Sequence, residues 1–286
     1  MQGFFNVNKP KGVTSAFVVG RLKKHFNIKK IGHMGTLDPM AQGVLPIAVG
    51  KAARLFNYLL EADTKQYLAV FQFGYETNTL DAEGEIIKEN GLFPTKEELL
   101  KASSGMVGKF AQMPPQFSAK KINGKKAYDY AREGIEVELK SKEIEIFELE
   151  LIKQISDNEF QFLITCSSGT YIRSIGRDLG VATNTLCTMT QLVRTKVGCF
   201  NIENSIDFEK LMQSNNAKAY ITATDSVLNF DTIEIDTSSM QKLKNGVAIQ
   251  VNKNNNTCFV KHENVLIGIG EITNNMLKLN TYLLED

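Results

Sequence analysis

The sequence predicts an α+β protein in which a large mixed domain precedes a small β-rich module. Its 286 residues are 43% hydrophobic and 23% charged, a composition typical of a globular chain. Helical and strand patterns alternate irregularly over most of the chain. Two long runs rich in β-branched residues, 137–156 and 159–168, are spaced like neighbouring antiparallel strands. These observations favour a mainly antiparallel sheet with helices around it.

The composition and the hydrophobic pattern of the sequence change after about Leu211. A polar stretch is followed by short strand patterns that are separated by Asn-Gly and Asn-Asn turns. Such a pattern is typical of a small β-rich module of about sixty residues. We therefore expect two domains, residues 1–222 and 223–286, with a basic insertion at about 109–135 in the first.

The N-terminal part predicts a strand over 3–12, a helix over 15–26, a loop over 31–50 and a helix over 52–62. Thr14 or Ser15 is a candidate N-cap for the first helix, whose apolar residues recur at helical spacing. The loop contains four glycines, a density that indicates tight bends or close approach to a ligand.

The later elements follow from the same rules. The expected strands are 65–74, 137–156, 159–168, 188–200, 242–249, 257–263, 265–272 and 276–284. A helix is expected over 94–108, a basic loop followed by a helix over 118–134, and a turn that enters a helix over 169–182. Thr95 and Glu98 have the spacing of a capping box. Residues 79–85 read as a turn.

Positive charge is concentrated in two segments, although the net charge is only +1. Residues 1–60 hold nine lysines and arginines and a single acid, Asp38, and residues 112–132 are also basic. Residues 133–160 and 225–286 are rich in acids instead. This distribution suggests an extended anionic partner such as nucleic acid. A solvated lysine-rich helix face is the other interpretation.

The cysteines indicate neither a zinc site nor a disulfide framework. Cys166, Cys187, Cys199 and Cys258 form no CxxC pair and accompany no histidine cluster, so we expect reduced thiols. A polar Asn-Lys-Pro stretch stands where a signal peptide needs apolar residues, and no apolar run reaches the length of a membrane span. We expect a cytoplasmic protein.

Asp38 is the most informative single residue. It lies among glycines, precedes Pro39, and is surrounded by cations, which keep a carboxylate ionised and suit it to act as a nucleophile. The proline restricts Asp38 to extended conformations and so presents its side chain from a fixed loop. For an isolated Asp-Pro pair, an Asx turn that closes on local backbone is the more common explanation. Composition alone leaves both interpretations open.

The surrounding motif changes that balance. It reads Gly32-His33-Met34-Gly35-Thr36-Leu37-Asp38-Pro39-Met40-Ala41-Gln42-Gly43-Val44-Leu45. This stretch resembles the signature of the TruB-type pseudouridine synthases, in which the aspartate is the essential catalytic residue. Further matches follow in the family's order: Asn8-Lys9-Pro10-x-Gly12-x-Thr14-Ser15, Lys65-x-Tyr67, Gln112-x-Pro114-Pro115-x-Phe117-Ser118-Ala119-x-Lys121, Gly169-Thr170-Tyr171-Ile172-Arg173 and Leu192-x-Arg194-Thr195. Together they cover residues 4 to about 200.

The resemblance implies a pseudouridine synthase fold: a mixed, mainly antiparallel central sheet flanked by helices and loops, with a C-terminal PUA-like module that binds RNA. It also implies a tRNA pseudouridine synthase that acts on uridine 55 in the T loop. The reaction breaks a ribose–uracil C–N bond and rejoins the base through carbon. Because no redox change occurs and no group enters, we expect no cofactor and no metal.

The resemblance also implies roles for individual residues. Asp38 acts as nucleophile or as the base of an elimination route, Arg173 pairs with it, and Tyr67 stacks on the uracil. The residues expected to bind substrate are Tyr171, Leu192, His33, Lys9 and Lys121. The two lysines are expected at phosphates. The flipped base leaves a vacancy in the RNA, where His33 is expected to stack.

Two other functions remain as alternatives. One is a non-catalytic RNA-binding or tRNA-folding protein on the same scaffold, and the other is an Asp-dependent hydrolase of small substrates. A buried-type ion pair between Asp38 and Arg173 would be unnecessary for binding alone. The preferred hypothesis is a monomeric isomerase that binds the T arm of tRNA without an obligate protein partner or a membrane.

Overall fold

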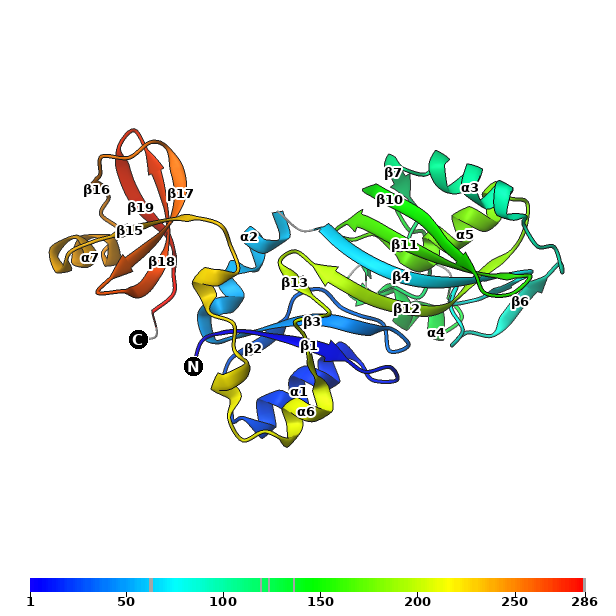
Figure 1. Ribbon diagram of the computed structural model, residues 1–286, viewed down its shortest axis with the longest axis horizontal. Coiled ribbons are helices and arrows are strands. Elements are labelled where there is room, and N and C mark those ends of the chain that lie inside the picture. The colour runs from blue at the N-terminus through cyan, green and yellow to red at the C-terminus, as the bar shows by residue number, and fades with distance from the viewer. Residues whose placement is uncertain (62–63, 119, 123, 136, 285–286) are drawn as a thin grey trace.

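The computed structural model describes residues 1–61, 64–118, 120–122, 124–135 and 137–284. It contains a ten-stranded sheet and a separate five-stranded sheet, which lie at opposite ends of the molecule (Figure 1). Helices flank the larger sheet, so the predicted α+β class is confirmed. Among the described residues, no helix is both long enough and apolar enough to span a bilayer.

The large sheet is mixed and mainly antiparallel, as predicted. Its strands are β1 (Gly3–Lys9), β2 (Ile31–His33), β3 (Gln42–Val49), β4 (Thr64–Phe73), β7 (Gly108–Gln112), β10 (Lys142–Gln154), β11 (Glu159–Ser167), β12 (Cys187–Val197), β13 (Phe200–Asn201) and β14 (Ile206–Asp207). The order is β14-β1-β3-β12-β4-β11-β10-β7, with β2 on β3 and β13 on β12. Within this sheet, only β1–β14 and β3–β12 pair in parallel among the strands described. The expected antiparallel pair 137–156 and 159–168 is present as β10 and β11.

Helices cover the two halves of this sheet separately. The helices are α1 (Ser15–His25), α2 (Phe56–Glu61), α3 (Lys96–Gly105), α4 (Ala127–Arg132), α5 (Ile172–Ala182), α6 (Phe208–Gln213) and α7 (Thr237–Lys244), with 3-10 turns η1 (Gly50–Leu55), η2 (Ala217–Tyr220) and η3 (Thr224–Ser226). Helix α5 packs on β12 and α3 on β10, around a core that includes Phe71 and Ile175. Helices α1 and α6 lie beside β1, around Phe5 and Leu45 (Figure 1).

The predicted helix caps are present. The hydroxyl of Thr14 accepts a hydrogen bond from the Phe17 amide at 3.0 Å, which satisfies one free N–H at the start of α1. At α3, Thr95 and Glu98 cap each other's backbone amides, and the capping box is complete.

The prediction of a loop over residues 31–50 is wrong for residues 31–33, which form β2, and for residues 42–49, which form β3. Strand β3 pairs with β1 from Gly43 to Val49 and is buried over the same residues. The prediction gave more weight to Gly43 and Pro46 than to the apolar residues around them, which are typical of a buried strand. Pro46 is tolerated inside the sheet, where its carbonyl accepts a hydrogen bond from the Met34 amide at 2.8 Å.

The smaller sheet is formed by the C-terminal residues. Its strands are β15 (Asp231–Glu234), β16 (Ile249–Gln250), β17 (Asn256–His262), β18 (Val265–Thr273) and β19 (Met276–Tyr282), in the order β15-β17-β18-β19-β16. The expected strand over 242–249 is wrong except for Ile249, which begins β16: residues 242–244 end α7 instead, and residues 245–248 connect the two elements. Asp236 caps that helix by accepting from the Ser239 amide at 2.7 Å, and this start signal lies outside the segment from which the strand was predicted.

An apolar cluster joins the small module to the large sheet. Phe4 and Ala48 from β1 and β3 belong to the same buried cluster as Phe259, Ile269 and Leu283 from the module. The two remaining hairpins are short and project from the large domain: β5 (Tyr75–Thr77) with β6 (Ile86–Glu89), and β8 (Lys121–Ile122) with β9 (Lys125–Lys126).

Candidate active site

The loop that carries Asp38 is tied down on both sides of the aspartate. Before it, the hydroxyl of Ser15 donates to the carbonyl of Leu37 at 3.0 Å and accepts from the Leu37 amide at 2.9 Å. After it, the Ala41 amide donates to the carbonyl of Asp38 at 3.1 Å. Three local bonds therefore fix the backbone from which the carboxylate projects.

Lys9 is part of this support. Its side chain is fully buried, and Nζ donates to the carbonyls of Pro10, Val13 and Pro39 at 2.9, 2.7 and 3.4 Å. The Gly12 amide donates to the same Pro39 carbonyl at 2.8 Å. The predicted phosphate contact is therefore wrong in this structure, because the ammonium faces backbone oxygens inside the protein. Residue type alone did not reveal that burial.

The buried position of Lys9 also changes its ionisation. Burial lowers the pKa of its ammonium to about 8, while the nearby carboxylate of Asp38 acts in the opposite direction. Near neutral pH the ammonium stays charged and holds the turn against the Asp38 loop.

Arg173 is the cation next to Asp38, as predicted. Its Nη2 lies 3.0 Å from Oδ2 of Asp38, and its Nη1 lies 3.2 Å from Oδ2 of Asp81. The same two nitrogens donate to the carbonyls of Phe117 at 3.0 Å and Thr79 at 2.9 Å. The guanidinium is thus held at four points, and only 7% of the side chain is exposed. A planar fork fixed in this way orients the carboxylate in front of it.

The second carboxylate, Asp81, was missed by the sequence analysis, which assigned its segment to a turn. It does lie in a turn, where Oδ1 accepts from the Thr79 hydroxyl at 2.7 Å and from the Glu83 amide at 3.1 Å. Its other oxygen binds Arg173. Burial raises the pKa of Glu83, and the charges of Asp81 and Asp38 raise it further. The turn therefore adds negative charge behind the Asp38–Arg173 pair.

A cavity of about 270 Å³ opens beside this pair. It is lined by Asp38 and Arg173 together with Tyr67, Tyr171 and Leu192, so the structure brings five of the predicted site residues together. Tyr67 and Leu192 lie on the paired strands β4 and β12 and are both mostly buried. The volume lies just below the range of roughly 300–1,000 Å³ of pockets for drug-sized ligands, and suits one nucleotide unit rather than a strand.

Two buried cations complete the wall of the cavity. Lys65 lies two residues before Tyr67 on β4, and its Nζ donates to the Ser168 hydroxyl at 3.0 Å. Arg194 pairs with Tyr67 in register and donates from Nη2 to the carbonyl of Gly35 at 3.1 Å. The sequence analysis placed both in motifs but gave neither a role. Only the sheet register reveals that they share the cavity with Asp38.

His33 and Lys121, like Lys9, are predicted substrate-binding residues that are not among the described residues lining this cavity. His33 lies at the end of β2, and burial, followed by the charge of Arg194, lowers the pKa of its imidazole. A neutral ring at physiological pH agrees with the expectation that it binds rather than exchanges protons. Lys121 has its backbone in β8, and its side chain lies outside the described part of the chain.

The geometry supports chemistry on a flat, uncharged ring. Asp38 is 37% exposed and reaches the cavity, whereas its partner Arg173 is buried. A carboxylate that is paired on one oxygen and open on the other can attack carbon or remove a proton. Aromatic walls from Tyr67 and Tyr171 suit the face of a base, and the cations suit its phosphates.

Comparison with known proteins places this arrangement in a family. The family model described as "TruB family pseudouridylate synthase (N terminal domain)" matches residues 23–172. The chain is 38% identical over 295 residues to the tRNA pseudouridine synthase B of Ehrlichia canis, covering 97% of this chain and 96% of that protein. It is 40% identical over 275 residues to the enzyme of the same name from Caldanaerobacter subterraneus, covering 94% and 95%.

Solved structures show the same fold. The chain matches a protein in a Cbf5–Nop10–Gar1 complex with a TM-score of 0.71 at 22% identity, over 99% of this chain and 85% of that one. A chain in an H/ACA RNP bound to a substrate RNA matches with the same TM-score at 20% identity, over the same shares. The predicted pseudouridine synthase fold is confirmed, and the protein belongs to the TruB family of pseudouridylate synthases.

Proposed function

We propose that this protein is a tRNA pseudouridine synthase that isomerises uridine 55 in the T loop. The observation that carries the proposal is the Asp38–Arg173 ion pair at the edge of a cavity sized for one nucleotide. Relatives of nearly equal length carry the name tRNA pseudouridine synthase B, which supports tRNA as the substrate. The basic N-terminal segment supplies charge for the RNA backbone.

In the proposed mechanism the target uridine leaves the stack and enters the cavity. Tyr67 stacks on the uracil, while Tyr171 and Leu192 enclose it. Asp38 acts as the nucleophile or as the base of an elimination, the C1′–N1 bond breaks, and the base turns. A C1′–C5 bond then forms as Asp38 leaves the substrate or returns the proton that it removed, N1 takes up a proton, and the hydrogen at C5 leaves as a proton. Arg173 keeps the carboxylate ionised and aimed.

Other residues support these steps in the same proposal. Lys65 and Arg194 provide positive charge to the flipped nucleotide, and Lys9 holds the Asp38 loop. His33 stacks where the uridine left the RNA, and Lys121 contacts a phosphate. Residues 1–222 form the catalytic domain, with a basic insertion at about 109–135, and residues 223–286 form the PUA-like module. The enzyme works as a cytoplasmic monomer on the T arm, without an obligate protein partner.

The decisive test is the release of tritium from unmodified tRNA labelled at C5 of uracil. Wild type should release one tritium per tRNA, and Asp38→Asn should release none while it still binds the RNA. Asp236→Asn, which alters the cap of α7 far along the chain, is the matched control and should retain turnover.

The competing function is RNA binding or tRNA folding without catalysis. A wild-type protein that binds tRNA yet releases no tritium would favour it and remove the catalytic roles. Retained release by Asp38→Asn would instead leave the activity in place and exclude Asp38 as its catalytic residue.

A further inference from the structure

A second, larger cavity lies away from the site of Asp38. Its volume is about 900 Å³, and none of the residues that line it lines the smaller cavity. It is bounded by the end of α1, the turn from β3 into η1, and residues 215–218 before and in η2. This volume exceeds what one nucleotide needs, so the cavity suits a longer stretch of polymer.

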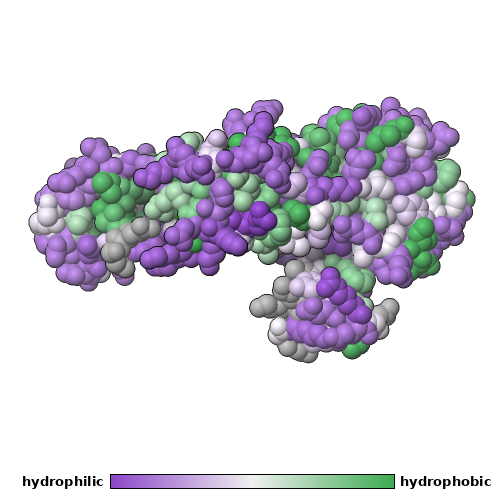
Figure 2. All heavy atoms as spheres, turned by 90° about the horizontal axis from the view of Figure 1, so that it is seen from below, coloured by the Kyte–Doolittle hydropathy of each residue, from purple (hydrophilic) through white to green (hydrophobic). Residues whose placement is uncertain are grey.

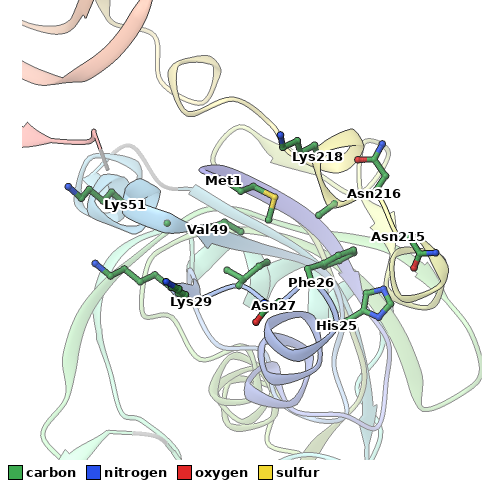
Figure 3. A pocket seen from close by; sticks show the side chains of 14 residues that line it. Met1, His25, Phe26, Asn27, Lys29, Val49, Lys51, Asn215, Asn216 and Lys218 are labelled. Atoms are coloured by element: carbon green, nitrogen blue, oxygen red, sulfur yellow. The ribbon is translucent and has the colours of Figure 1, made fainter. Parts of the chain in front are cut away.

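The described residues that line the cavity include no carboxylate. Its basic side chains are His25, Lys29, Lys30, Lys51 and Lys218. Figure 3 shows Lys29 and Lys51 on one side of the cavity and Lys218 on another, with Val49 between the two sides. Such a cavity raises the local concentration of an anion.

The lysines on its rim are available to a ligand. Lys29, Lys30 and Lys218 are exposed, and no ion pair with a carboxylate is found for them within the described ranges. The floor of the cavity is apolar, because Ile28, Val49 and Ala217 are buried members of one hydrophobic cluster. An apolar floor with an amide and ammonium rim fits sugar and phosphate together.

The basic surface continues from the cavity onto the C-terminal module. The ammonium of Lys51 lies 5.1 Å from the centre of the Tyr282 ring, and that of Lys244 lies 5.8 Å from the same ring. Arg54 donates to the Tyr282 carbonyl at 2.6 Å. The module is acidic in total, and at this junction it contributes Lys244 beside Lys51 and Arg54 of the large domain. The face that carries α1 and α6 is largely hydrophilic (Figure 2).

The position of the cavity relates it to the active site. Strand β3 begins next to the Asp38 loop at Gln42 and ends at the cavity with Val49. Seven residue steps at about 3.3 Å each separate these ends by about 23 Å. An RNA whose loop occupies the site of Asp38 would meet the cavity with a part that lies about one such strand length from that loop.

We infer that the cavity bounded by α1, η1 and η2 binds the sugar-phosphate backbone of the tRNA beyond its T arm. The identity of this RNA rests on the proposed function. The ligand chemistry rests on the cavity's own charge and shape. The T loop is held at Asp38, and the cavity holds the part of the molecule that a T-arm hairpin lacks.

The test compares two RNAs and two triple variants. The cavity variant combines Lys29→Gln, Lys30→Gln and Lys218→Gln. The control variant changes the exposed lysines Lys96, Lys101 and Lys153 to glutamine. Binding of full-length tRNA and of a T-arm hairpin is measured by filter retention between 50 and 200 mM salt, and C5 tritium release is measured on both.

The cavity variant should bind full-length tRNA about tenfold more weakly or worse at 0.1 M salt, with a salt slope reduced by about one unit for each lost phosphate contact. Its binding and turnover of the hairpin should equal those of wild type. Unchanged tRNA affinity and slope, or equal losses on both RNAs, would overturn the inference. A wild type that binds tRNA without releasing tritium would contradict the proposed function alone, since the comparison of affinities still tests the cavity.

Discussion

Arg173 and Asp81 form an ion pair inside the protein, with Nη1 of the arginine 3.2 Å from Oδ2 of the aspartate and only 7% and 5% of their side chains exposed. The same guanidinium binds Asp38, whose side chain is 37% exposed. One guanidinium thus pairs with two carboxylates, of which Asp81 is buried and Asp38 is partly exposed. Asp81 and two carbonyls anchor the arginine, which leaves its other edge to orient Asp38.

Removing the charge of Asp81 should impair the chemical step. Asp81→Asn is expected to lower kcat at least about tenfold with little change in KM, since Asp81 is not among the residues that line the cavity. It should also lower the free energy of unfolding by about 1–3 kcal/mol. Single-turnover tritium release and urea unfolding measure the two effects. Asp178→Asn, in α5 beside its partner Arg177, is the control. A normal kcat in Asp81→Asn would refute this role.

The two adjacent hydroxyls of Thr14 and Ser15 should separate stability from catalysis. Thr14→Ala removes a helix cap and should cost about 0.5–2 kcal/mol with kcat retained. Ser15→Ala removes both bonds to Leu37 and should cost about 1–3 kcal/mol and also lower kcat, because the Asp38 loop loses its support. Thermal unfolding and tritium release on both variants test the split. Equal kcat values in the two variants would contradict it.

Lys9 should give the protein a distinct pH dependence. Its pKa is about 8 in the folded state against 10.5 in the unfolded chain. Between pH 8 and pH 10.5 the unfolded chain binds more protons at Lys9 than the folded protein does. The contribution of Lys9 to the free energy of unfolding therefore rises with pH in this range, whereas below pH 8 its burial penalty is constant. The difference in unfolding free energy between wild type and Lys9→Met should therefore increase from pH 8 to 10.

Urea titrations at several pH values measure this difference. Lys96→Met, at an exposed position in α3, controls for the loss of any lysine. A difference between wild type and Lys9→Met that is flat with pH would show that the ammonium is not buried as described.

Gly43 should tolerate no side chain. Its φ is +110°, and a Cβ there would overlap the carbonyl oxygen of Arg194, which is backbone in the neighbouring strand. Gly43→Ala is expected to lower the free energy of unfolding by more than about 2 kcal/mol. Gly20→Ala, on open surface in α1, should raise it by about 0.5–1 kcal/mol. Denaturant titration checks both, and a stable Gly43→Ala protein would contradict the close approach of β3 and β12.

The sequence predicted the site where a motif of mixed residue types surrounds the reactive group. Asp38 and Arg173 were paired in this way, although 135 positions separate their numbers. The sequence analysis missed Asp81 because a turn is a sufficient explanation for an aspartate at that position. Only the tertiary fold brings Arg173 next to it. Lys9 was misassigned because a lysine in a basic segment is exposed by default, and burial depends on the tertiary fold.

The fold was predictable to a similar degree, and for a related physical reason. Local signals such as the Thr95 cap determine where a helix starts, and these were correct. The strand β3 was obscured because its glycine and proline are compatible with a sheet only when specific partners satisfy the backbone. Pairing of β12 with both β3 and β4 is a long-range choice that local pattern does not encode.

The bond from Arg194 to the carbonyl of Gly35 spans 159 residues and has a consequence for how the enzyme comes into being. During synthesis the Asp38 loop leaves the ribosome long before the segment that forms its wall. Contacts of such separation close late and slowly, because loop entropy must be overcome first. The site of Asp38 is therefore among the last parts of the chain to assemble, and a nascent or truncated chain that stops before β12 has no complete pocket in which to hold a uridine.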